Sequence, residues 1–262
     1  MKQVRAKKFL GQHFLKDKEI ARSIVRSLIE KCDTSLLLEV GPGMGVLTEI
    51  LLEEKEKEIH AIDLDNESVL FLKQKFPSLA DRLIEGDFLQ LDIPQLFGKP
   101  VSVIGNFPYN ISSQIIFRLI EFRRSIPLLV GMFQKEVAER ICAKNRTKSY
   151  GILSVFTQTW FETEYLFTVP PEVFDPPPKV HSAVIRLTRK GNPIEPEDEI
   201  LFRQVVKTAF NQRRKQLRNA LHPYKLEDEL LKKEGFLTKR AEELSPADFL
   251  KLTSLIRNHG KE

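Results

Sequence analysis

The chain has 262 residues, enough for one large domain or for a large domain with a small companion. Hydrophobic residues make up 42% and charged residues 29%, which excludes collagen-like, low-complexity and wholly disordered chains. The two cysteines, Cys32 and Cys142, cannot form a disulfide framework or a cysteine-based zinc site. The apolar runs are far shorter than the roughly 20 residues that span a membrane, so we expect a reduced, cytoplasmic protein without membrane contact.

Basic residues are concentrated in three segments, although the formal net charge is only +5. Residues 1–26 carry eight Lys or Arg against two acids, residues 118–148 carry eight against three, and residues 203–218 carry six and no acid. One such cluster is as readily a solvated helix face as a binding surface. Three together favour a nucleic acid, whose phosphates a basic surface binds. The candidate side chains for this contact are Lys7, Lys8, Arg140, Lys144, Arg146, Lys148, Arg213, Arg214, Lys215 and Arg218.

Strand and helix patterns alternate through the first two thirds of the chain. Short apolar runs predict strands at 36–40, 59–63, 83–85, 101–105 and 127–133, with helices at 47–54, 67–75, 112–122 and 135–143. Such repeated units are typical of an α/β fold with a parallel, doubly wound sheet, whose sites lie at the carboxyl ends of the strands.

After residue 150 the pattern changes. Strands predicted at 165–169 and 180–187 flank a proline-rich turn, and we expect them to extend the sheet in antiparallel fashion. A linker at 191–196 is followed only by helical patterns, at 201–221, 226–234, 238–243 and 246–258. The last begins after Ser245-Pro246, an N-cap followed by proline at the first helical position. We therefore expect a large α/β domain at 1–190 and a small α-helical domain at 197–262.

A glycine-rich segment at 39–45, EVGPGMG, separates the first predicted strand from its helix. Glycine allows a sharp turn and a close approach of ligand to backbone, here at Gly41 and Gly43. Asp63 lies 22 residues after Gly41 at the end of the next strand, where a carboxylate can bind ribose hydroxyls. A dinucleotide site would need a third glycine where Val46 stands, so a nicotinamide oxidoreductase is the weaker alternative.

Two further acids bear on the identity of the nucleotide. Glu39 precedes the glycine segment, and Asp87 follows the third predicted strand, although Asp87 alone could be a turn residue. Acids here would repel a pyrophosphate but suit a cofactor that carries a sulfonium and an ammonium group. S-adenosylmethionine carries both, and the sequence favours it as the cofactor.

The segment Asn106-Phe107-Pro108-Tyr109 follows the fourth predicted strand. The exocyclic amine of adenine is a poor nucleophile because its lone pair is delocalised into the ring. The Asn106 side-chain oxygen and the Phe107 carbonyl can accept its two N–H groups out of the ring plane, and Pro108 stiffens the turn. Tyr109 offers a face on which an extruded base can stack. The segment predicts methylation of a base amine.

Several segments together resemble the KsgA-type small-subunit ribosomal RNA adenine dimethyltransferases, relatives of the Erm methyltransferases, over nearly the whole chain. They are KFLGQHFL at 8–15, the glycine segment at 39–45, NFPYNIS at 106–112, QKEVAER at 134–140, PPPKV at 176–180 and FNQRRKQL at 210–217. The resemblance implies a Rossmann-like S-adenosylmethionine-dependent methyltransferase domain and a small helical RNA-binding domain. It also implies transfer of four methyl groups to two adjacent adenosines near the 3′ end of 16S RNA, in the small ribosomal subunit or its precursor.

The resemblance also assigns roles to single residues. Cofactor contacts fall on His13, Leu15, Gly41, Asp63, Asp87 and Asn106. Phe174 matches an aromatic residue that covers the other face of the target base, although it could equally be a buried aromatic at a strand end. The sequence departs from the family at Asp63 (usually Glu), at Phe107 (usually Leu) and at His181 (commonly Asp). We expect no metal, because the five histidines show no ligand spacing, and a monomer.

Two alternatives remain open at this point. An Erm-type enzyme would modify 23S RNA of the large subunit, but the segments at 9–15 and 213–217 favour the small subunit. In a different class, the chain could be a ribosome assembly factor that occupies the immature subunit, with methylation secondary.

Overall fold

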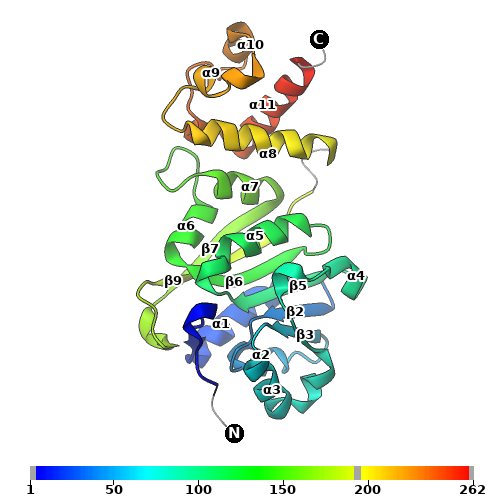
Figure 1. Ribbon diagram of the computed structural model, residues 1–262. Coiled ribbons are helices and arrows are strands. Elements are labelled where there is room, and N and C mark those ends of the chain that lie inside the picture. The colour runs from blue at the N-terminus through cyan, green and yellow to red at the C-terminus, as the bar shows by residue number, and fades with distance from the viewer. Residues whose placement is uncertain (1–3, 192–195, 260–262) are drawn as a thin grey trace. The chain divides into compact units, whose positions relative to one another are not determined.

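The computed structural model describes residues 4–191 and 196–259. Its main sheet has seven strands in the order β4-β3-β2-β5-β6-β9-β7 (Figure 1). The strands from β2 to β6 pair in parallel, and β9 pairs antiparallel with β6, as the sequence predicts. Their bounds are β2 (Leu36–Val40), β3 (Glu58–Asp63), β4 (Leu83–Glu85), β5 (Val101–Asn106), β6 (Leu128–Gln134), β7 (Phe161–Val169) and β9 (Ser182–Arg189).

Helices precede, connect and follow the parallel strands. They are α1 (Lys18–Ile29), α2 (Val46–Leu51), α3 (Asn66–Lys75), α4 (Ile93–Phe97), α5 (Ser112–Glu121) and α6 (Lys135–Cys142). Sequence reasoning missed α1, although its signals are ordinary: the Asp17 side chain caps the first turn and one face buries Ala21, Ile24, Val25 and Leu28. The buried face of α1 packs against α2 and β6.

The chain order reverses between β2 and β5. From β2 the chain continues outward through β3 to β4, and β5 then returns to the other side of β2. A site is expected in the crevice at the carboxyl ends of such a pair. Here these ends are Val40, followed by the glycine segment, and Asn106.

A second, two-stranded sheet was not predicted. It pairs β1 (Phe14–Leu15) antiparallel with β8 (Phe174–Asp175), so that Leu15 lies opposite Phe174. Strands of two residues carry too short a pattern to be recognised from the sequence. Their pairing fixes the N-terminal segment beside a region about 160 residues away in the chain.

The chain forms two compact units, Met1–Ala138 with Glu162–Arg189, and Glu139–Phe161 with Lys190–Glu262. The second unit contains α7 (Ile152–Trp160), which packs against α8 (Pro196–Asn211) and α11 (Pro246–His259). These units divide the chain differently from the expected domains at 1–190 and 197–262, and that division stays a prediction. Most of the linker expected at 191–196 lies outside the described residues.

Of the predicted C-terminal helices, one is interrupted and another is wrong. The helix predicted at 201–221 ends at Asn211, and after a turn Gln216 is extended and bridges to Arg240 before α9 (Leu217–Ala220). The helix predicted at 238–243 is only a 3₁₀ turn, η7 (Ala241–Glu243). By contrast, α10 (Asp228–Lys233) and α11 lie where expected, and Ser245 caps α11 by accepting the Asp248 N–H.

In the part of the chain that the structure describes, no helix combines the length and the apolar character needed to cross a bilayer.

Candidate active site

A cavity lies at the carboxyl ends of β2 and β5, at the expected reversal of the chain order. It is lined by backbone that follows four parallel strands and by the N-terminal segment at 10–14. The structure brings together most of the predicted site residues here: His13, Gly41, Gly43, Asp63, Asp87, Asn106, Phe107, Pro108 and Tyr109. Leu15 is buried and lines a small adjoining hollow that shares Gly41, Gly43 and Asn106 with the cavity.

The glycine segment folds as a turn with left-handed backbone. Gly41 and Gly43 have φ of 69° and 55°, a conformation that side chains disfavour. A Cβ on Gly43 would lie 2.9 Å from the ring of Phe14, whereas a Cβ on Gly41 would have its nearest neighbour 3.9 Å away. Because Gly43 has no side chain, the Phe14 ring can pack against it. Because Gly41 has none, open space remains in which a ligand can approach the backbone.

Asp63 is buried at the end of β3, and its carboxylate faces the glycine turn. Its two oxygens accept the backbone N–H of Gly43 at 3.1 Å and that of Asp65 at 2.8 Å. Burial raises the pKa of Asp63 above its ordinary value, and these backbone hydrogen bonds oppose the rise. The carboxylate is thus held in one orientation in the cavity, which fits a group that binds ribose hydroxyls.

Glu39 does not supply the negative charge expected from the sequence. It is 1% exposed beneath the glycine turn and accepts a hydrogen bond from Thr48 Oγ1 at 2.6 Å. Burial raises its pKa to about 8, which favours the neutral form of the side chain at pH 7. Asp63 and Asp87 are the acids of the predicted set that line the cavity.

Asn106 ends β5 at the cavity wall. Its Nδ2 donates to the carbonyl oxygen of His13 at 2.8 Å, which fixes the orientation of the planar amide and leaves Oδ1 as the acceptor arm. The next residue, Phe107, is buried, and its N–H donates to Met132 of β6. The backbone that presents the Phe107 carbonyl is thereby tied to the sheet.

Tyr109 lies on the same wall as His13. The two rings stack with centroids 5.3 Å apart, and the Tyr109 hydroxyl hydrogen-bonds to Ser182 Oγ. The His13 Nδ1 atom lies 2.7 Å from the carbonyl oxygen of Pro176. Tyr109 is therefore held at both ends as an aromatic wall of the cavity, as stacking on a base requires.

Phe174 is not brought to the cavity. It is 1% exposed, pairs with Leu15 across the small sheet, and belongs to the hydrophobic core. Its assignment to the target base therefore stays a prediction.

Sequence reasoning missed several residues that shape the cavity, among them Gln12, Phe14, Leu64 and Asn110. Gln12 and Phe14 lie inside the KFLGQHFL segment that carries the family resemblance. The sequence therefore marks this segment as important without indicating what each of the two residues does. Asn110 likewise lies inside the NFPYNIS segment, whereas Leu64 gives no separate signal, because a loop neighbour of a site is found only from the folded structure.

Basic residues from two distant segments meet in the second unit. Arg146, Lys148, Arg213 and Arg214 line one open hollow together with Thr147, Arg240 and Glu242. Arg213 is fixed there by an ion pair with Glu242 Oε2 at 2.6 Å and a hydrogen bond to the carbonyl of Lys148. Five more residues of the predicted RNA-binding set are exposed: Lys8, Arg140, Lys144, Lys215 and Arg218. Lys7 instead has carboxylate partners within the chain.

Nearly the whole chain is similar to proteins of one named kind. The family model described as "Ribosomal RNA adenine dimethylase" matches residues 3–258. A protein named Ribosomal RNA small subunit methyltransferase A from Flavobacterium johnsoniae is 52% identical over 261 residues, which is 99% of each chain. The protein of the same name from Bacteroides thetaiotaomicron is 51% identical over 257 residues, 98% of this chain and 96% of its own.

Solved structures agree with this finding. A dimethyladenosine transferase from Plasmodium falciparum superposes with a TM-score of 0.81 at 27% identity, covering 95% of this chain and 98% of the other. The 23S rRNA methyltransferase ErmE gives a TM-score of 0.72 at 25% identity, covering 93% and 99%. The expected Rossmann-like methyltransferase fold is therefore confirmed.

The expected enzyme class and cofactor, S-adenosylmethionine, are confirmed by the same comparisons. The chain belongs to the ribosomal RNA adenine dimethylase family.

Proposed function

We propose that this enzyme dimethylates two adjacent adenosines in the 3′-terminal hairpin loop of 16S RNA, within the small ribosomal subunit or its precursor in the cytoplasm. Relatives at about half identity are named as small-subunit methyltransferases, whereas ErmE, which acts on 23S rRNA, is 25% identical. This contrast favours the small subunit over an Erm-type substrate.

The observation that carries the proposal is the placement of the Asn106 amide. Its Nδ2 is committed to the His13 carbonyl, so Oδ1 is the arm that accepts a hydrogen bond in the cavity. Asp63 and the Gly41 turn line the same cavity, so the acceptor and the cofactor residues share one space. An adenine amine that enters there lies beside a cofactor bound along the glycine turn.

The residues of the chain supply positioning and oriented dipoles. The Asn106 Oδ1 atom and the Phe107 carbonyl accept the two N–H groups of the adenine amine and turn its lone pair out of the ring plane. Tyr109 stacks on one face of the base. When bound, S-adenosylmethionine would supply the methyl group of its sulfonium for in-line displacement by the amine and would leave as the neutral thioether, and the nitrogen would lose one proton at each transfer.

The residues that bind the two partners are assigned on the same basis. His13, Leu15, Gly41, Gly43, Asp63, Asp87 and Asn106 bind the cofactor. The basic hollow of the second unit, lined by Arg146, Lys148, Arg213 and Arg214, binds RNA phosphates. The other assigned phosphate contacts are Lys8, Arg140, Lys144, Lys215 and Arg218.

Undermethylated small subunits test the proposal. Incubated with the enzyme and labelled S-adenosylmethionine, they should acquire two dimethyladenosines in the 3′-terminal hairpin, while fully methylated subunits from the same preparation acquire none. Label in 23S RNA alone would show an Erm-type enzyme instead.

The variant Asn106→Ala tests the role of the amide. We expect the variant to retain cofactor binding by calorimetry with only a modest loss of affinity, because Asn106 is one of several assigned cofactor contacts and the glycine turn and Asp63 are untouched. Methyl transfer should fall by about 10²–10³-fold, since an oriented dipole at the reacting nitrogen is lost. Near-normal turnover would refute this assignment. Subunit binding by the inactive variant measures how far an assembly role is independent of methylation.

A further inference from the structure

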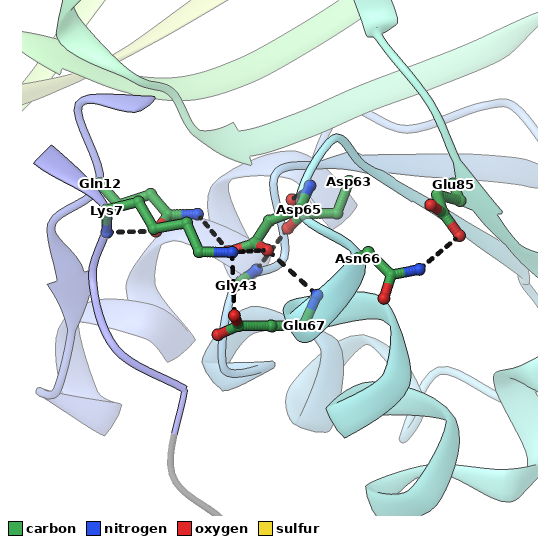
Figure 2. A network of polar contacts seen from close by, with 8 residues as sticks. All are labelled: Lys7, Gln12, Gly43, Asp63, Asp65, Asn66, Glu67 and Glu85. Atoms are coloured by element: carbon green, nitrogen blue, oxygen red, sulfur yellow. Dashed lines mark hydrogen bonds and ion pairs between the residues drawn. The ribbon is translucent and has the colours of Figure 1, made fainter. Parts of the chain in front are cut away.

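The N-terminal segment at 7–14 is tied to the loop that follows β3. Lys7 Nζ lies 2.6 Å from Asp65 Oδ1 and 3.4 Å from Glu67 Oε1, and Gln12 Nε2 donates to Asp65 Oδ2 at 3.2 Å. Lys7 and Gln12 are themselves joined, because the Lys7 N–H donates to Gln12 Oε1 at 2.8 Å. Figure 2 shows both side chains converging on the Asp65 carboxylate.

Asp65 connects this contact to the carboxylate in the cavity. Its N–H donates to Asp63 Oδ1 at 2.8 Å, and its own Oδ1 caps α3 by accepting the Glu67 N–H at 3.0 Å (Figure 2). The Asp65 side chain is fully buried, whereas Lys7 is about one quarter exposed. An ion pair in this setting is screened less by water and salt than a surface pair.

The other end of the segment contacts the catalytic side of the cavity. The His13 carbonyl accepts Asn106 Nδ2, and the Phe14 ring fills the space beside Gly43. Leu10, Gly11 and Gln12, between the two ends, line the cavity. One stretch of chain therefore runs from the loop of Asp63 to the amide of Asn106.

Few apolar contacts hold the middle of this stretch. None of the three residues of the short helix η1 (Lys8–Leu10) is buried, and Phe9 is 78% exposed. Ordering an exposed stretch costs conformational entropy that contacts elsewhere must offset. The polar contacts of Lys7 and Gln12 on Asp65 anchor its N-terminal end, after the buried Val4.

We propose that Lys7 and Asp65 are positioning residues: their ion pair latches the segment at 7–14 over the cofactor cavity and so holds Asp63 and the Asn106 amide in working geometry. The proposal rests on the proposed function of this cavity. It gives Lys7 a role within the enzyme in place of the phosphate contact predicted from the sequence.

The charge states of the pair agree with this role. Burial would raise the pKa of Asp65, but hydrogen bonds from Lys7 and Gln12 outweigh it and the pKa is lowered. The hydrogen bond to Asp65 raises the pKa of Lys7. Both groups are therefore charged at neutral pH, and the latch is closed under the conditions in which the enzyme works.

The variants Lys7→Met and Asp65→Asn open the latch while sparing the fold. Methionine keeps the length of the lysine stem, and asparagine keeps an oxygen that can cap α3. In calorimetry without RNA, each should weaken S-adenosylmethionine binding by about tenfold, and the double variant should be no weaker than either single variant. Lys7→Arg should restore most of the affinity.

Lys18→Met is the matched control. It removes another N-terminal lysine whose Nζ is 2.7 Å from a carboxylate, that of Glu49, but neither residue lines the cavity. Its cofactor affinity should equal that of the unmodified enzyme. Hydrogen exchange of the free protein gives a second readout: Lys7→Met should speed exchange at 8–14 by about tenfold and leave the core strands unchanged.

The outcomes separate the possible failures. Unchanged cofactor affinity and unchanged exchange in Lys7→Met overturn the latch, and a loss confined to RNA binding makes Lys7 a phosphate contact. If the unmodified enzyme binds no S-adenosylmethionine, the proposed function of the cavity fails, and the latch fails with it. Methylation of the 3′-terminal hairpin by the unmodified enzyme, together with unaltered cofactor affinity in both variants, would leave the proposed function intact and refute the latch alone.

Discussion

At the scale of single residues, the surroundings of Phe107 explain how the protein accommodates a side chain larger than the usual leucine. Its ring lies over Gly105 and Gly131, and a Cβ on Gly131 would fall 2.1 Å from a ring carbon. Phe133 packs on the ring with centroids 4.9 Å apart. The two glycines thus leave room for the larger ring, and the Phe107 N–H keeps its hydrogen bond to Met132 of β6. The main-chain carbonyl of His181 accepts the N–H of Lys135, and nothing in the structure explains the histidine side chain.

The buried Glu39 makes the folding stability of the protein depend on pH, in a direction that follows from its raised pKa. Its pKa is raised from 4.5 to about 8 by burial, so the folded chain binds the proton more tightly than the unfolded chain. Neutral Glu39 therefore makes its full contribution to the free energy of unfolding below about pH 4.5, and this contribution is lost as the pH rises through about 8. Glu39→Gln removes the titrating group. Between pH 4.5 and 8 the free energy of unfolding of the parent should therefore fall relative to that of the variant by a few kcal/mol, at about 1.4 kcal/mol per pKa unit.

Urea unfolding at a series of pH values measures this difference. Glu56→Gln, on an exposed turn, is the matched control and should follow the parent at every pH. A constant difference between Glu39→Gln and the parent would show that Glu39 is ionised in the folded protein.

At the scale of elements, the turn after α8 shows why a helical pattern failed. Periodicity continues through 201–221, but the backbone of Leu217 donates to the carbonyl of Lys239, and Gln216 bridges Arg240. These tertiary contacts outweigh local helix propensity. The turn places Arg213 beside the segment at 146–148, which a continued helix would carry away from it.

Substitutions in this turn test whether its basic residues bind RNA. Arg213 is tied to Glu242, so Arg214→Glu with Lys215→Glu reverses charge without breaking that pair. The double variant should bind subunits more weakly, and the slope of log affinity against log salt should fall by roughly one for each phosphate that the variant no longer binds. Lys232→Glu, an exposed lysine of α10 in the same unit, is the control and should keep the parent slope. An unchanged slope in the double variant would make this turn a solvated face.

At the scale of the whole molecule, the second unit is built from two stretches of chain. Phe156 and Trp160 of α7 contact Phe202 of α8, with ring centroids 5.9 and 5.7 Å apart. A fragment of residues 1–190 therefore keeps α7 but loses the helices that cover it. We expect this fragment to aggregate or bind a hydrophobic dye.

Trp160 reports on this fragment directly, because it is the only tryptophan and is buried in the full chain. Its fluorescence emission should shift to the red in the fragment relative to the full-length protein. A monomeric fragment with unshifted emission would instead support the domain division at 1–190 and 197–262.

Much of the first unit was predictable because its parallel strands are short apolar runs separated by turn residues. The cofactor side of the site followed from the glycine segment and Asp63, which lie where the alternating pattern places them. The parts that could not be predicted depend on contacts between distant residues, such as the pairing of Leu15 with Phe174 and the bond from Asn106 to His13. The helix α7 was missed because it is buried almost all round and has no charged residue to mark a solvent-facing side.

The neighbour of β6 at the far side from β5 is β9, which the ribosome makes about fifty residues later. Until residues 182–189 have emerged, the nascent chain carries β6 with one row of backbone donors and acceptors open, a form prone to wrong pairing. The stretch 139–161 likewise waits for α8 and α11. Each unit therefore lacks a part of its structure while the middle of the chain is being translated. We expect the protein to complete its folding only near the end of synthesis.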